Sequence, residues 1–276
     1  MNPTWIRLTL VTLLCPALFA ADDLFVKANA MLQEALESRN PDTRKQTVAA
    51  LSLAASRDPY LSRLIAMLQD KDAEVRLATV SSLSEVKNKA ATAALRKALE
   101  DEVPEVSFAA AKALWASRDP LGKRALMAVL QGESKANSSF LSKQKREALR
   151  MMHTPRTALL FAAKQGAGLA PIPGLGGGIS SMQAILADPE LSGRAASALL
   201  LGQQRDAATL QALKDALFEK DSSLRAAAVH SLALTNDPAV KKNIAPLLED
   251  DKEAVRLRAA AAYVRLSPAP ARRTSK

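Results

Sequence analysis

The sequence predicts an all-α protein, a right-handed α-α superhelix of about seven stacked helix pairs. Three observations lead to this fold class. A twelve-residue pattern, clearest from Asp72 to Leu83, recurs along the chain at intervals in the thirties. Apolar residues repeat every three or four positions, as in Leu61, Leu64 and Leu68, and no strand-like alternation persists. Aromatic residues make up 4% of the chain against 48% hydrophobic residues, so the expected core is mostly Ala, Leu and Val.

The repeated pattern contains two apolar anchors, eight residues apart, in each unit. First anchors are predicted at Thr43, Val75, Val106, Leu141, Leu191, Leu224 and Val255. Second anchors are predicted at Leu51, Leu83, Leu114, Leu149, Leu199, Leu232 and Tyr263. The intervals between first anchors are 32, 31, 35, 50, 33 and 31 residues, which is typical of a stacked repeat. The long interval indicates an insertion between the fourth and fifth units.

Residues 1–21 resemble a secretory signal peptide. Arg7 precedes an apolar run from Leu8 to Ala20 that is too short to span a bilayer, and Asp22 follows small residues. Cleavage after Ala20 would put Leu18 where a small residue is preferred, so an uncleaved anchor is the alternative. We therefore predict export to the periplasm or cell envelope, with no transmembrane span beyond this segment.

Each unit is expected to contain a first helix, such as 58 to 69, and a second helix, such as 72 to 86. Asp or Asn near the start of many second helices can cap the free backbone N–H groups. Proline is tolerated at the first helical position, because the backbone N–H that it lacks would have no partner within the helix there. Five dipeptides combine both features: Asn40-Pro41, Asp58-Pro59, Asp119-Pro120, Asp188-Pro189 and Asp237-Pro238.

The helix pairing, the period, the Asp-x-x-[Val/Leu]-Arg start and the Ala-rich second helix resemble HEAT repeats of the short bacterial type, also called PBS-lyase-like HEAT repeats. The resemblance covers residues 22–266 and implies an armadillo-like α-solenoid with the second helices on its concave face. The family's arginine is matched by Arg44, Arg76, Arg225 and Arg256, while Ser107, Ser142 and Ser192 replace it in three units. We interpret this column as an internal ladder in which each Arg bonds an Asp or a carbonyl of a neighbouring repeat. The alternative is a basic stripe for an acidic partner.

The long interval contains an uncharged segment from Gln165 to Ala187. Its Gly and Pro residues, concentrated at about 165–178, would break a membrane-spanning helix. GLGGG also lacks the Lys-Ser/Thr of a phosphate-binding loop. We expect an apolar loop folded against the solenoid, and the alternative is a contact tip for a partner or lipid formed by Leu169, Ile172 and Leu175.

A dense basic patch precedes this insertion. It is interpreted as a solvated helix face, or alternatively as a surface that attracts lipid head groups, cell-wall polymer or an acidic protein. The residues are Lys143, Lys145, Arg146 and Arg150. At the other end, residues 267–276 form a Pro-rich basic tail that is expected to be disordered.

No catalytic set is evident, so we expect neither enzymatic activity nor a cofactor. Cys15, the only cysteine, lies in the predicted signal peptide. His230 aligns with positions that tolerate polar residues and is expected at the surface. Some iron-dependent hydroxylases built from HEAT repeats bind metal through His-Glu pairs, but here Thr154 follows His153 and Ser231 follows His230. No metal site is therefore predicted.

The favoured function is an exported, non-catalytic scaffold or adaptor that binds a protein partner through its solenoid surface. A nucleic-acid or polyanion binder is the first alternative, because the net charge is +10. Predicted export and the scarcity of aromatic residues that could stack on bases argue against nucleic acid. A lyase-like or hydroxylase-like enzyme, by family analogy alone, is the second alternative.

Overall fold

The computed structural model describes residues 16–131, 193–204 and 206–268, and every regular element within these ranges is a helix. The N-terminal part contains α1 (Pro16–Leu36), α2 (Pro41–Leu51), α3 (Tyr60–Ala66) with the 3-10 helix η1 (Met67–Gln69), α4 (Ala73–Glu85), α5 (Lys89–Ala98), α6 (Pro104–Ala116) and α7 (Pro120–Leu130). The C-terminal part contains α11 (Gly193–Leu201), α12 (Ala207–Ala216), α13 (Ser222–Leu234), η2 (Pro238–Val240), α14 (Lys241–Ile244), η3 (Ala245–Glu249) and α15 (Glu253–Leu266). The predicted all-α solenoid is confirmed.

Polar side chains begin several of these helices. Asn40, Asp72 and Asp221 each accept hydrogen bonds from backbone N–H groups of the first turn of the helix that follows. The prediction for Asp58-Pro59 is wrong, because α3 begins only at Tyr60 and has no side-chain cap. Asp188-Pro189 lies outside the described residues.

The apolar anchors form the core. All anchors that the structure describes are buried: Thr43, Leu51, Val75, Leu83, Val106, Leu114, Leu199, Leu224, Leu232, Val255 and Tyr263. Small residues between the anchors, such as Ala227 and Ala259, are also fully buried, which lets adjacent second helices approach closely. Leu141, Leu149 and Leu191 lie outside the described residues.

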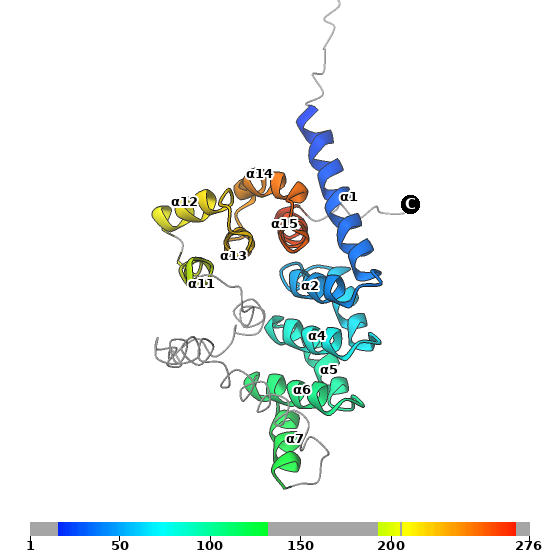
Figure 1. Cartoon of the computed structure of the whole chain (residues 1–276). Coiled ribbons are helices and arrows are strands. Elements are labelled where there is room, and N and C mark those ends of the chain that lie inside the picture. Colours follow the sequence, from blue (N-terminus) through cyan, green and yellow to red (C-terminus); the bar gives the residue numbers. More distant parts are fainter. Residues whose placement is uncertain (1–15, 132–192, 205, 269–276) are drawn as a thin grey trace, which may run out of the picture.

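The order of the second helices in space differs from their order in the chain. α11 packs on α13, α13 on α15, α15 on α2, α2 on α4 and α4 on α6 (Figure 1). The last repeat therefore stacks on the first, and one curved row contains both parts of the chain. These helices line the inner side of the curve in Figure 1, whereas α12 and α14 lie on its outer side.

Helix α15 packs on α1 and α2, and we call this interface the seam. Two arginines reach across it in opposite directions. Arg57 donates to the carbonyl oxygens of Val264 and Ser267, both at 2.5 Å. Arg265 donates to the carbonyl oxygen of Leu53, also at 2.5 Å. Ser267, which the sequence analysis placed in a disordered tail, is buried at this seam and is part of the fold.

Helix α1 extends across the predicted signal-peptide boundary. It begins at Pro16 and continues to Leu36, so the predicted cleavage position after Ala20 lies within the helix. Cleavage stays a prediction. None of the helices in the described ranges is both long and apolar enough to cross a membrane.

Candidate functional site

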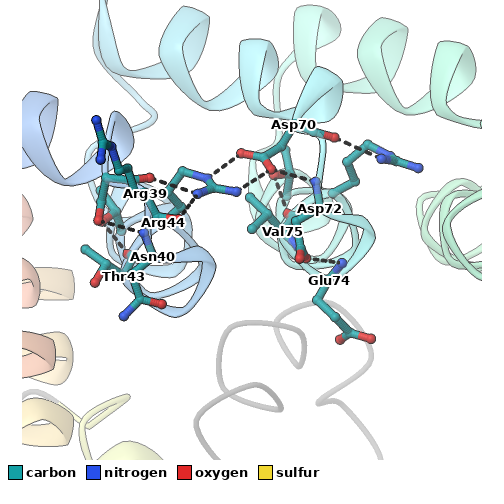
Figure 2. A network of polar contacts seen from close by, with 12 residues as sticks. Arg39, Asn40, Thr43, Arg44, Asp70, Asp72, Glu74 and Val75 are labelled. Atoms are coloured by element: carbon teal, nitrogen blue, oxygen red, sulfur yellow. Dashed lines mark hydrogen bonds and ion pairs between the residues drawn. The ribbon is translucent and has the colours of Figure 1, made fainter.

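The arginine column lies between adjacent units of the row. Arg44 on α2 donates from Nε and Nη2 to the two carboxylate oxygens of Asp70, at 2.7 and 2.8 Å (Figure 2). Its third nitrogen, Nη1, donates to the carbonyl oxygen of Ser38 at 2.8 Å. Asp70 in turn accepts the backbone N–H of Asp72, the residue that caps α4. The guanidinium of Arg44 thus links its own unit to the next unit, at the loop that precedes α4.

Two further arginines repeat this geometry. Nε and Nη2 of Arg76 donate to Asp101 at 2.9 and 3.0 Å, and Nη1 donates to the carbonyl oxygen of Asp70 at 2.9 Å. Nε and Nη2 of Arg225 donate to Asp250, both at 2.7 Å, and Nη1 donates to the carbonyl oxygen of Glu219. In all three, the Nε–Nη2 edge binds a carboxylate and Nη1 binds a carbonyl.

Burial and ion pairing shift the pKa values of Asp70 and Arg44 in opposite directions. Burial by itself would raise the pKa of Asp70, but the hydrogen bonds from Arg44 and from the Asp72 backbone outweigh it, so the pKa of Asp70 is lowered. The hydrogen bond to Asp70 raises the pKa of Arg44. Both side chains remain ionised at neutral pH and neutralise each other. Arg44, Arg76 and Arg225 each bind a carboxylate in this way, so these three arginines form a structural ladder of ion pairs, each pair a rung, rather than a free basic stripe.

Arg256 differs from the other three because it has no carboxylate partner among the described residues. Its Nη1 donates to the carbonyl oxygen of Asp250 at 2.7 Å and to that of Asp251 at 3.2 Å. The second helix stacked next to α15 in space is α2, and Ser38 lies six residues before Arg44 on α2, as Asp70 lies six residues before Arg76. The ladder therefore lacks a carboxylate at the seam.

Sequence reasoning did not predict the ion pair between Arg194 and Glu219. Arg194 donates to Glu219 at 2.8 Å, on the exposed surface between α11 and the next unit. The family's arginine position in this unit is Ser192, and Arg194 stands two residues further along the chain. Glu219 lies six residues before Arg225, just as Asp70 lies six residues before Arg76. An acidic residue at this distance before the arginine of the next unit could therefore have predicted the pair.

A groove runs between the first helices of two units, α3 with η1 on one side and α5 on the other. Its volume is about 1020 Å³. Ile65 and the small side chains of Ala90, Ala93 and Ala94 provide apolar lining, because alanines on α5 leave room beside α3. Charged residues of both signs also line it: Asp70, Lys71, Arg76, Lys97, Glu100, Asp101 and Glu102.

A family model described as HEAT repeats matches residues 61–137 and 180–265, more than half of the chain. The chain belongs to the HEAT-repeat family. It is 17% identical to human deoxyhypusine hydroxylase in complex with glycerol, over 90% of this chain and 98% of that one, with a TM-score of 0.30. It is also 17% identical to a designed armadillo repeat protein, over 86% and 99%, with a TM-score of 0.27. Such low TM-scores carry no functional argument, and no curated protein matches the chain.

A second polar cluster of this HEAT-repeat protein lies where α13 meets α15. His230 is 5% exposed and Arg258 is 7% exposed, and Arg258 Nη1 lies 3.3 Å from His230 Nδ1. The prediction of a surface histidine is wrong, because Arg258 extends from α15 against the ring and the packed helices remove it from water. Burial, with smaller contributions from Arg258 and Arg265, lowers the pKa of His230 to about 3. The neutral ring accepts at Nδ1, since a guanidinium can only donate.

The predicted partner-contact residues of this HEAT-repeat protein lie outside the described residues: Leu169, Ile172, Leu175, Lys143, Lys145, Arg146 and Arg150. The same holds for His153. Within the ranges that the structure describes, no group of three or more His, Cys, Asp or Glu residues could hold a metal ion. The HEAT-repeat fold is compatible with a protein-interaction scaffold, and a fold by itself does not define an activity.

Proposed function

We propose that this HEAT-repeat protein is an exported, non-catalytic scaffold that binds a protein partner through its solenoid surface. The observation that carries the proposal is the groove between the first helices α3 and α5. Its apolar lining and its charges of both signs are features that favour binding of a segment of another protein. The curved row of second helices adds an extended surface, as is usual in repeat proteins. Export is supported by the composition of residues 1–21.

Partner capture from the envelope fraction tests the proposal. We would crosslink and purify the full chain, an Ala93→Arg variant and an Ala212→Arg control. Both alanines are exposed on first helices, but Ala93 lines the groove and Ala212 does not. The proposal expects a defined protein partner that is lost with Ala93→Arg and kept with Ala212→Arg. If no protein is enriched over a mock purification, the scaffold function is wrong.

The same experiment distinguishes the groove from the Gly/Pro-rich insertion. A chain that lacks residues 166–178 would keep the partner if the groove is the contact surface. Loss of the partner on this deletion, with an unaffected result for Ala93→Arg, would assign recognition to Leu169, Ile172 and Leu175 instead. Circular dichroism of each variant first establishes that the solenoid remains folded.

Localisation needs its own measurement. Cell fractionation followed by N-terminal sequencing of the mature protein should find the chain in the periplasm or envelope, beginning after residue 20 or 21. A chain recovered with Met1 in the cytoplasmic fraction would contradict export. In that case a nucleic-acid or polyanion binder becomes the better explanation of the net charge of +10, and DNA affinity that falls steeply with salt would support it.

A further inference from the structure

Three consecutive first helices, α3 with η1, α5 and α7, contain basic residues and no acidic residue. Acids of the same part of the chain lie on other helices, as Asp42, Glu74 and Glu105 do, or in the loops. These first helices therefore carry positive charge without a compensating acid of their own. Their cations are Arg63, Lys89, Arg96, Lys97, Lys123 and Arg124.

The acids that line the groove between α3 and α5 are mostly used within the fold. The carboxylates of Asp70 and Asp101 are each bound at both oxygens by a ladder arginine. Glu102 lies 3.6 Å from Nη2 of Arg76, which also binds Asp101. Among the acids that line the groove, Glu100 alone forms no ion pair with a residue that the structure describes.

The lysines of the groove are not used in this way. Lys71 beside η1 and Lys97 on α5 form no ion pair within the described ranges, although Lys71 helps to lower the pKa of the adjacent Asp70. Lys89, Ala93 and Lys97 stand four residues apart on α5 and therefore share one side of the helix. All three are exposed, and Ala93 and Lys97 line the groove. Unpaired lysines thus border its apolar lining.

We propose that this groove binds an acidic, amphipathic segment of the protein partner. The apolar side chains of the segment pack against Ile65 and the alanines of α5, and its carboxylates lie at Lys71, Lys89 and Lys97. Flexible lysine side chains can follow carboxylates without fixing their position, so the apolar lining places the segment and the charge selects it. The inference rests on the proposed function, because it names the chemistry of the partner at the same groove.

A synthetic amphipathic peptide, with Leu and Ala on one helical face and Glu on the other, is the probe. The full chain would be titrated with this Glu peptide and with the same peptide carrying Gln or Lys in place of Glu, while fluorescence anisotropy is followed. We expect the Glu peptide to bind most tightly and the Lys peptide least, with a difference that shrinks as salt is added. Hexaglutamate, which has no apolar face, should bind about tenfold more weakly than the Glu peptide, or worse.

Lysine variants test the charge. Lys89→Gln and Lys97→Gln should each weaken binding of the Glu peptide by about two- to fivefold, as is usual for exposed charge pairs. Glu100→Gln should strengthen it, because a repelling charge is removed. Lys242→Gln is the matched control, since Lys242 is exposed on the first helix α14 and does not line the groove. Equal binding of the Glu peptide by the wild type and by the Lys89→Gln, Lys97→Gln double variant would overturn the proposal.

Arginine variants separate the groove from a general attraction of acids to a basic surface. Ala93→Arg adds a positive charge but fills the apolar lining, so we expect weaker binding of the Glu peptide. Ala212→Arg adds the same charge on α12, away from the groove lining, and should not weaken binding. Tighter binding by Ala93→Arg, or equal affinity for hexaglutamate and the Glu peptide, would show that the protein senses charge alone and would refute the site.

The two proposals fail separately. A captured partner that is lost with Ala93→Arg but kept with the Lys89→Gln, Lys97→Gln double variant would support the scaffold function and refute the acidic segment. Peptide binding with the expected response to the variants, but no protein captured from the envelope fraction, would support the preference of the groove and refute the scaffold function. Circular dichroism first establishes that each variant is folded.

Discussion

The guanidinium of Arg44 and the carboxylate of Asp70 form a two-point ion pair, at 2.7 and 2.8 Å, in which the two side chains are 6% and 7% exposed. The pair joins the first two units of the chain at the loop where α4 begins. A rung of this kind contributes mainly by specifying how one repeat sits on the next, because the cost of removing both charges from water offsets much of their attraction.

Breaking this rung from one side should destabilise the protein strongly. Arg44→Ala leaves the Asp70 carboxylate buried and unpaired, with an expected loss of about 3 kcal/mol in the free energy of unfolding. Replacing both partners by apolar residues, in Arg44→Met with Asp70→Leu, should cost much less than the single change. Urea unfolding of both variants checks this, and equal losses would show that the charges are not coupled.

The seam should gain a rung when a carboxylate is supplied. Ser38→Asp places an acid opposite Arg256, in the register that Asp70 occupies opposite Arg44, and we expect up to about 1 kcal/mol of added stability because Arg256 is half-buried. Ser38→Asn is the neutral control, since Asn retains an acceptor for the Asn40 backbone N–H that Ser38 now binds. The gain should vanish in the Arg256→Ala background, and a gain that persists there would come from another interaction.

Stability should fall as the pH is lowered below about 6.5, through His230. Its pKa is lowered to about 3 in the folded protein, so between these two pH values the unfolded chain binds the additional proton and unfolding is favoured as pH decreases. The slope can reach about 1.4 kcal/mol per pH unit for one proton. His230→Gln keeps an acceptor for Arg258 but cannot titrate, so urea unfolding at pH 7.5 and pH 5 should show a smaller pH effect in this variant. Identical pH dependence in both proteins would contradict a buried neutral His230.

The repeat register can be tested within one helix. Leu232 on α13 is fully buried and Leu234 is 38% exposed. Leu232→Asp buries an unpaired charge and should abolish the cooperative melting transition, whereas Leu234→Asp should lower the midpoint only moderately. The same loss is expected for Leu83→Asp on α4. Thermal unfolding followed by helical circular dichroism measures all three, and an unchanged midpoint for Leu232→Asp would refute the register.

The sequence by itself determined the repeat fold of this protein. Helix pairs, their caps and their buried anchors follow from local spacing, because a helix with an apolar residue at Val75 and another at Leu83 can bury them only on one face. The positions of the ladder arginines could also be predicted from the sequence. Arg44 and Arg76 stand one repeat period apart, and each binds an acid of the next unit in the chain.

The tertiary structure alone decided which units are neighbours at the seam. α15 and α2 are about 200 residues apart in the chain, and no local pattern states that Arg57 will reach Val264 or that Arg265 will reach Leu53. The same reason explains His230, whose exposure depends on Arg258 from another helix. Periodicity predicts which residues each helix buries, but the stacking of surfaces that are distant in the chain, and so the burial of His230 against Arg258, results from contacts that only the folded chain creates.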